Sequence, residues 1–171
     1  MSGSIHHFAT RLVWTGAARG PVRDYDGYSR EHALHVAGKP TLVTSSAPVF
    51  RGDPALHNPE ELLVAALASC HFLAYAALCA RGGVVLLGYE DDATGTMAYD
   101  RTRKVMAFTE VSLRPRCTVA AGTDVARAMA LHDTAHHECF IANSVNFPVG
   151  HDPVLVVAER DDVRATTPSS K

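Results

Sequence analysis

The sequence NPEELLVAALASCHFLAYAALCARGG occupies residues 58–83 and is typical of one long helix. Asn58 is suited to cap this helix, Pro59 fits its first turn, and Glu61 can close a capping box with Asn58. A cation followed by two glycines, at 81–83, indicates its C-terminus. Because the interior is apolar on nearly every face, we expect this helix to be buried on all sides.

The same run approaches the roughly 20 residues that span a bilayer. It is rich in alanine, however, and it carries Ser69, Cys70 and His71 in its middle and two glutamates at its start. We therefore expect the central helix of a soluble protein, packed against another helix at an interface, and not a membrane span.

The whole chain has the composition of an ordinary globular protein, with 171 residues, 47% of them hydrophobic, and a net charge of -2. This length and composition suit a single domain, expected over residues 1–160, followed by a disordered tail at 161–171. The charge is not basic enough for nucleic acid binding. The N-terminal Met1-Ser2-Gly3-Ser4 lacks the features of a signal peptide, so we expect a cytoplasmic protein with reduced thiols.

Short alternating segments on both sides of the long helix predict β-structure. The expected strands cover residues 6–14, 28–36, 41–45, 84–87, 89–97 and 105–114, with short ones near 147–149 and 154–157. The first three form an antiparallel meander, with loops rich in Gly and Pro at 17–27 and 47–57. A charged turn at 100–104 makes the later strands a long hairpin that continues toward Val119.

A second helix is expected from Thr123 or Asp124 to about Cys139. Its expected inward face consists of Val125, Met129, Leu131, Ala135 and Cys139.

The same helix carries His132, His136 and Cys139 at i, i+4 and i+7, a spacing that can hold zinc. No second motif with ligand spacing completes the set, so the metal site stays a minor alternative and we expect no metal cofactor.

The four cysteines, at 70, 79, 117 and 139, form no Cys-x-x-Cys pair, which excludes a zinc ribbon or a thioredoxin motif. Cys70 lies three turns into an apolar helix, where burial keeps a thiol protonated and the helix dipole has faded. A reactive Cys70 therefore needs a cation from elsewhere. Cys139, at the end of the second helix, is the other candidate, and Cys79 and Cys117 are expected to be structural.

Arg51 is expected to supply this cation, and Glu60 is expected to hold it in place. Arg51 lies in the constrained loop before the helix, and Glu60 is not needed for capping, so that a carboxylate-held arginine would stabilise the thiolate. Ten helical residues, about 15 Å, separate Glu60 from Cys70. Either the helix is interrupted, or the arginine spans the gap, or Glu60 serves the cysteine of a partner chain.

Several motifs of this sequence resemble those of the OsmC/Ohr family of thiol peroxidases. The motifs that carry the resemblance are Asn-Pro-Glu-Glu-Leu-Leu at 58–63, Ser-Cys-His at 69–71, Phe-Thr-Glu-Val at 108–111, Leu-Arg-Pro at 113–115 and Cys-Phe-Ile-Ala-Asn-Ser at 139–144. The likeness runs from about residue 6 to 159. It implies an α+β, OsmC-like fold, in which curved antiparallel sheets enclose two long helices of an intertwined homodimer with active sites at the interface.

The resemblance also implies roles for individual residues. Cys70 would be the peroxidatic cysteine, Cys139 the resolving cysteine, and Glu60 the carboxylate that orients an active-site arginine. Arg51 matches the OsmC-type position of that arginine, offset by one residue, whereas the Ohr-type position favours Arg19, and Arg30 is a further alternative. Ser-Cys-His replaces the family's usual Ala-Cys-Phe, which marks a divergent branch.

The sequence thus leads to a functional hypothesis. Cys70 reduces an organic hydroperoxide to an alcohol and becomes a sulfenic acid, Cys139 closes a disulfide with it, and an external dithiol reduces that disulfide. No cofactor is required, and a wall of leucines with Phe72 and Tyr75 would favour fatty or aromatic peroxides. The alternative is a non-catalytic dimer that binds an apolar small molecule in the cleft between the helices.

Overall fold

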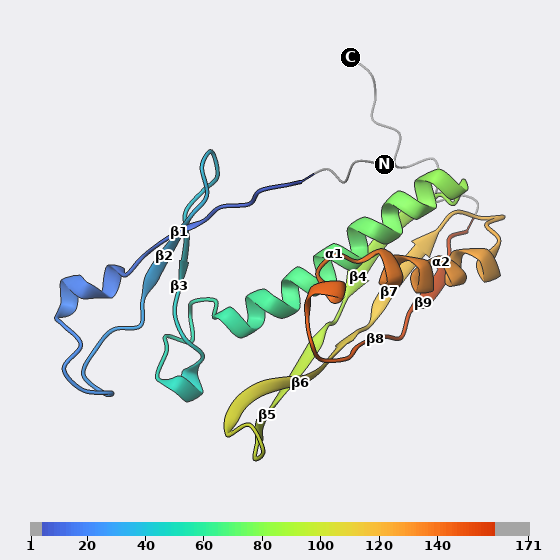
Figure 1. Cartoon of the computed structure of the whole chain (residues 1–171). Coiled ribbons are helices and arrows are strands. Elements are labelled where there is room, and N and C mark those ends of the chain that lie inside the picture. The colour runs from blue at the N-terminus through green and yellow to red at the C-terminus, as the bar shows by residue number, and fades with distance from the viewer. Residues whose placement is uncertain (1–4, 160–171) are drawn as a thin grey trace. The chain divides into compact units, whose positions relative to one another are not determined.

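A computed structural model describes residues 5–159, and the long apolar helix in it is α1, Pro59–Gly82 (Figure 1). The predicted capping box is present, since Asn58 Oδ1 accepts from the Glu61 amide at 2.9 Å and Glu61 Oε2 accepts from the Asn58 amide at 3.3 Å. Gly83 follows with a φ of 71°, a left-handed conformation that costs glycine little. Both predicted ends of the helix are confirmed.

Only one stripe of α1 is buried within the chain. It consists of Leu67, His71, Tyr75 and Cys79, which recur every fourth residue. The prediction of burial on all sides is wrong for the single chain, because the sheets and α2 cover one face of α1 and Leu73 remains 64% exposed. By length and composition α1 is also the one helix within residues 5–159 that could cross a membrane, a test that core helices of soluble proteins pass too.

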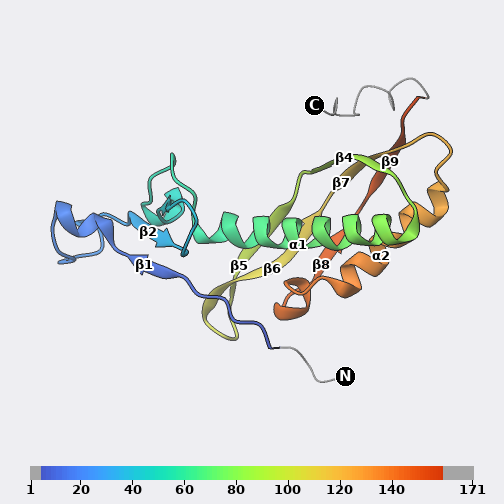
Figure 2. The same ribbon diagram turned by 90° about the horizontal axis from the view of Figure 1, so that it is seen from above.

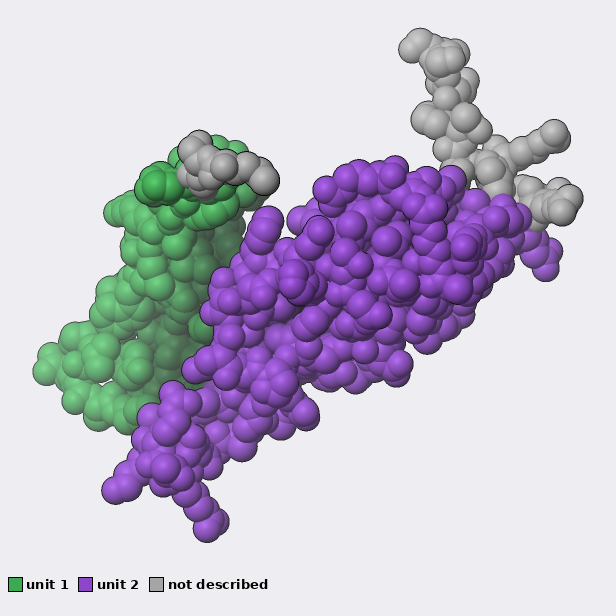
Figure 3. Space-filling view, turned by 45° about the vertical axis from the view of Figure 1, so that its right-hand side comes forward, with its two compact units in different colours: residues 1–63 green, residues 64–171 purple. Residues whose placement is uncertain are grey.

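The chain divides into two compact units, residues 1–63 and 64–171, which Figure 3 distinguishes by colour. The first unit contains an antiparallel meander of β1 (Arg11–Val13), β2 (His32–His35) and β3 (Leu42–Thr44), as predicted, although the first strand is much shorter than residues 6–14. Short 3-10 helices, η1 (Thr15–Arg19) and η2 (Pro48–Phe50), interrupt the segments expected as loops.

The second unit contains the rest of α1 and two three-stranded sheets. Its remaining elements are β4 (Leu86–Asp91), β5 (Thr94–Asp100), β6 (Val105–Leu113), β7 (Pro115–Val119), α2 (Val125–Glu138), η3 (Ala142–Ser144), β8 (Val149–His151) and β9 (Val154–Val157). The sheet orders are β4-β7-β9 and β5-β6-β8. The predicted β5–β6 hairpin is present, but β7 joins the other sheet, and each sheet gains a parallel C-terminal strand beside an antiparallel pair.

Both helices pack against the same face of β7. Cys117 of β7 lies 3.6 Å from the ring of His132 on α2 and belongs to the same buried cluster as Tyr75 of α1. Alanines of α2 complete this cluster, because their small side chains let the helix approach the sheet closely. Figure 2 shows α1 and α2 together beside strands β4, β7 and β9. This α+β architecture agrees with the predicted fold class.

The second helix begins at the second of the two predicted caps, where the Asp124 side chain accepts from the Arg127 amide at 3.0 Å. Its inward face agrees with the prediction only in part, since Ala135 and the C-cap Cys139 are buried as expected, but the other buried residues are Ala128 and His132. Val125, expected inside, is 42% exposed. The difference arises because the buried side of α2 includes His132, which counts as polar in a hydrophobic pattern. The tail expected at 161–171 lies outside the described residues.

Candidate active site

The two cysteines predicted to carry the chemistry are brought together by the turn that follows α2. The amide of Ile141 donates to Cys70 Sγ at 3.5 Å, and the next amide, of Ala142, donates to Cys139 Sγ at 3.4 Å. Because neighbouring amides of one turn bind the two sulfurs, Cys70 and Cys139 lie side by side. Both are free thiols.

This turn is held in place by its own hydrogen bonds. The amide of Asn143 donates to the Cys139 carbonyl at 3.0 Å, and the Asn143 side chain donates to the His137 carbonyl at 2.8 Å and to that of Cys139 at 3.0 Å. These bonds satisfy carbonyls that the end of α2 would leave without partners. The amides of residues 141 and 142 are thereby fixed toward the sulfurs.

The two thiols differ in their surroundings. Cys139 is 1% exposed, whereas Cys70 is half-buried. Burial, followed by the hydrogen bond with the Cys70 side chain, raises the pKa of the Cys139 thiol to about 11. Cys139 is therefore protonated at neutral pH and a poor nucleophile, which leaves Cys70 as the thiol that a substrate can reach first.

A groove of about 830 Å³ runs beside Cys70. Its apolar lining comes from Ala66, Leu73, Ala74, Ala77, Phe140 and Ile141. An ion pair between Arg81 and Glu138, 3.6 Å apart, also lines the groove. The predicted wall of Phe72 and Tyr75 is wrong, because Phe72 packs on Tyr89 with ring centroids 4.8 Å apart and Tyr75 is fully buried in the core.

Glu60 lies in the first turn of α1, where Glu61 takes the capping role and leaves it free, as predicted. Its Oε2 is shielded from solvent and has no hydrogen-bond partner among the described residues. A buried carboxylate oxygen without a donor is costly, so this atom is suited to receive a cation.

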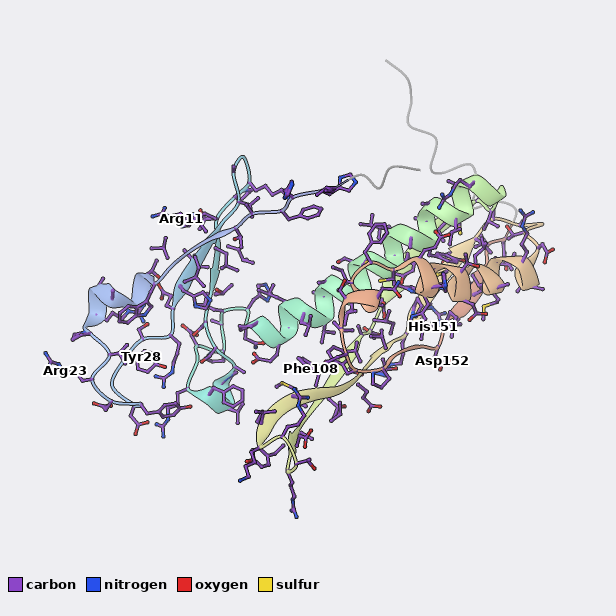
Figure 4. All side chains as sticks on the ribbon, in the orientation of Figure 1. Arg11, Arg23, Tyr28, Phe108, His151 and Asp152 are labelled. Carbon is purple, nitrogen blue, oxygen red and sulfur yellow. The ribbon has the colours of Figure 1, made fainter. Side chains whose placement is uncertain are left out.

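The three candidate arginines are each engaged within the first unit. Arg51, in a left-handed conformation with a φ of 65°, pairs with Asp26 at 2.9 Å. Arg19 pairs with Glu31 at 2.7 Å. The Arg30 guanidinium lies 4.1 Å from the centroid of the Tyr28 ring, which Figure 4 labels, and donates to the Tyr28 carbonyl at 2.7 Å. No ion pair joins any of them to Glu60 in residues 5–159.

The histidines considered as zinc ligands form a different arrangement. His132 binds the His71 ring at 3.1 Å and contacts Cys117, while Cys139 turns to Cys70. Within residues 5–159, no group of three or more His, Cys, Asp or Glu side chains could hold a metal ion. Sequence reasoning missed this buried histidine contact, although His71 lies on the Leu67, Tyr75 and Cys79 stripe of α1 and could have been placed in the core by its spacing.

Comparisons with known proteins agree with this fold. A family model described as "OsmC-like protein" matches residues 52–152. No curated protein matches the sequence significantly. An OsmC-like protein of unknown function from Vibrio cholerae is 28% identical, with a TM-score of 0.80, 88% of this chain covered and 100% of the other.

Two solved structures named for peroxide resistance are similar in fold. An organic hydroperoxide resistance protein OsmC from Legionella pneumophila has a TM-score of 0.65 at 16% identity, covering 90% of this chain and 98% of that one. The organic hydroperoxide resistance protein OhrB of Bacillus subtilis has a TM-score of 0.59 at 17% identity, covering 87% and 98%.

Proposed function

Because this chain belongs to the OsmC-like protein family, whose structural neighbours include organic hydroperoxide resistance proteins, we propose that it is a thiol-dependent peroxidase that reduces organic hydroperoxides to alcohols. The observation that carries the proposal is the pairing of Cys70 and Cys139 on the neighbouring amides of residues 141 and 142.

The reaction begins at Cys70. Its thiolate attacks the terminal oxygen of the hydroperoxide, the O–O bond breaks, and the departing alkoxide takes up a proton to leave as the alcohol. Cys70 becomes a sulfenic acid. The Ile141 amide supports the formation of the thiolate, because a hydrogen bond to a charged group contributes about 1.5–3 kcal/mol and the charge on sulfur is greatest in the thiolate.

Cys139 completes the cycle. Its sulfur attacks the Cys70 sulfenic sulfur, an S–S bond forms, and the hydroxyl leaves with the Cys139 proton as water. The high pKa of Cys139, about 11, keeps this thiol in reserve until the sulfenic acid has formed next to it. An external dithiol then reduces the disulfide and restores both thiols, without any cofactor.

Arg51 is our first candidate for the cation, with Arg19 and Arg30 as the alternatives. In this proposal Arg51 exchanges Asp26 for the unpartnered Oε2 of Glu60 when the site assembles, and its guanidinium stabilises the thiolate and the peroxide oxygens. Breaking the Arg51–Asp26 contact costs little, because the two residues form an exposed ion pair.

We further propose that the active form is an intertwined homodimer in the cytoplasm, bound to neither nucleic acid nor membrane. The exposed apolar surface formed by α1 and the turn after α2 supports this, since Leu73 of α1 and Phe140 of the turn are 64% and 81% exposed and both line the groove beside Cys70. A second copy would bury this face and close the open side of the groove.

A stopped-flow assay with cumene hydroperoxide and a dithiol reductant tests the proposal. Wild-type protein is expected to turn over, and Cys70→Ser to lose turnover by at least about 1000-fold, since the nucleophile is removed. Cys117→Ser is the matched control, because it makes the same substitution at a cysteine that is fully buried against His132 and is expected to keep wild-type turnover. Equal turnover in wild type and Cys70→Ser would refute the assignment.

The groove also favours a second candidate, a non-catalytic protein that holds an apolar small molecule. Its volume of about 830 Å³ and apolar lining are of the kind that binds such molecules. In that case a fluorescent fatty acid would bind equally well to wild type and Cys70→Ser, and neither would consume peroxide.

A further inference from the structure

Four histidines from three elements meet in the interior of the second unit. They are His71 on α1, His132 and His136 on α2, and His151 on β8, the last of which is labelled in Figure 4. His71 Nε2 and His132 Nδ1 lie 3.1 Å apart, and both side chains are 0% exposed. The His151 ring lies 5.5 Å from that of His71 and 5.2 Å from that of His136, measured between centroids. We call these four residues the histidine cluster.

The surroundings of the cluster offer little compensation for positive charge. The other titratable side chains around it are Tyr75 and Cys79 of α1, Tyr89 and Asp91 of β4, Cys117 of β7, and Asp133 and His137 of α2. The carboxylate in contact is that of Asp133, whose Oδ1 lies 3.5 Å from His151 Nε2. One carboxylate can balance one protonated ring, so a second proton in the cluster is uncompensated.

The hydrogen bond between His71 and His132 also requires that at least one of these two rings is neutral. In the bond between His71 and His132 one nitrogen donates and the other accepts, and two protonated rings would place two N–H groups against each other. Moreover, the Nδ1 atoms of His71, His136 and His151 are buried and have no hydrogen-bond partner among the described residues. A proton added at any of these atoms would find no acceptor.

The electrostatics agree with this geometry. Burial, and then the neighbouring histidines, lower the pKa of His71 to about 4 and that of His132 to about 3. In the unfolded chain both titrate near 6.5. Because the folded values are the lower ones, the stability that these neutral rings contribute is complete above about pH 6.5 and is lost as the pH falls toward 4.

The cluster is directly linked to both cysteines of the site. His71 follows Cys70 on α1, and the His136 carbonyl accepts from the Cys139 amide at 3.3 Å. We propose that the histidine cluster is an acid-sensitive latch that holds α1 against α2 at neutral pH and releases it in mild acid, separating Cys70 from Cys139. The consequence for peroxide reduction rests on the proposed function, whereas the latch itself does not.

Urea unfolding followed by near-ultraviolet circular dichroism, from pH 7.5 to 5, tests the latch. For each ring, the unfolding equilibrium constant is expected to rise about 30-fold between these two pH values, and about 1000-fold for His71 and His132 together. In the double variant His71→Leu/His132→Phe, most of this rise should disappear, because both hydrogen-bonding partners are replaced by apolar groups of similar size. His7→Gln, at an exposed site, should follow the wild-type curve.

A double variant with the wild-type pH dependence would overturn the proposal. If that variant does not fold, NMR of the wild-type protein decides, since ring resonances of His71 and His132 that titrate near pH 6.5 in the folded state would equally overturn the proposal.

The reactivity of Cys139 toward a pyridyl disulfide reagent, which is active in mild acid, provides the local readout. Cys139 should become at least about 10-fold more reactive at pH 5 than at pH 7.5 relative to a small-molecule thiol, and unchanged relative reactivity would contradict the opening. Neither readout depends on peroxide turnover.

Discussion

At the scale of single residues, the site is defined by the different environments of two chemically identical side chains. Cys70 is half-buried beside an apolar groove, and Cys139 is 1% exposed at the end of α2. Each sulfur accepts one amide hydrogen bond, so the difference in reactivity comes from burial and access. In the proposed function, this difference makes Cys70 the attacking cysteine and Cys139 the resolving one.

Replacement of Cys139 separates these two roles. In Cys139→Ser the first attack on peroxide should proceed, but the Cys70 sulfenic acid has no neighbouring thiol and is oxidised further to a sulfinic acid. Intact-mass spectrometry after repeated peroxide additions should show two added oxygen atoms on Cys70 and a loss of turnover.

Cys79→Ala is the control for this experiment, because Cys79 is buried in the core stripe of α1. It should retain a Cys70–Cys139 disulfide after oxidation. Sustained turnover of Cys139→Ser with a dithiol as the only reductant, and no monothiol present, would contradict the resolving role of Cys139.

At the scale of elements, local sequence and close packing act together. The ends of α1 are specified by side chains of its first turn and by a terminal glycine, which need no distant contact. The β5–β6 hairpin, in contrast, depends on the absence of a side chain at Gly95, where an added Cβ would lie 2.6 Å from Phe108 and 2.9 Å from Val64. Phe108 is labelled in Figure 4.

Loss of the α1 cap should destabilise the protein. Asn58→Ala removes the acceptor for the Glu61 amide and is expected to lower the free energy of unfolding by about 1 kcal/mol. Asn58→Asp keeps an acceptor at the same position and should cost much less. Urea denaturation at pH 7.5 measures both, and equal stability of Asn58→Ala and wild type would show that the cap does not contribute.

Gly95→Ala should destabilise the hairpin by overpacking, at a cost of about 1–3 kcal/mol. Gly88→Ala on β4 is the matched strand control, since its Cβ would meet Thr118 at an ordinary 3.6 Å. Thermal unfolding should show a lower midpoint for Gly95→Ala alone. If the two variants melt together, the close contact is relieved by movement of the Phe108 ring.

At the scale of the whole molecule, the long apolar helix is only partly covered by its own chain. The interior side of α1 packs on β7 and α2 and includes a histidine, whereas the other side presents Leu73 and lines the groove with Phe140. An apolar face of this kind needs a cover in water. The proposed homodimer supplies it with a second copy of the same face.

Leu73→Glu should therefore produce a monomer. Each copy loses about 2 kcal/mol of apolar burial and places a carboxylate in the interface, so the dimer dissociation constant should rise at least about 1000-fold. Light scattering should give twice the mass of one chain for wild type and the mass of one chain for the variant.

Val157→Glu, an exposed apolar position on the edge strand β9, should remain dimeric. A monomeric wild-type protein at micromolar concentration would contradict the homodimer.

The sequence alone determined those features that depend on neighbouring residues. These include both ends of α1, the start of α2 at Thr123 or Asp124, the β5–β6 hairpin and the N-terminal meander, because capping and strand alternation act over a few residues. The motifs between residues 58 and 144 also carried the resemblance to the family, which the family model confirms, and singled out Cys70 and Cys139 as candidates.

Only the tertiary structure decided how α2 is rotated, which amides reach the two sulfurs, and that four histidines share one interior. These features depend on the packing of elements that are far apart in the chain, which local periodicity does not encode. A histidine counts as polar in any hydrophobic pattern. Its side chain is buried in a core only where the surrounding helices and strand stabilise the neutral ring.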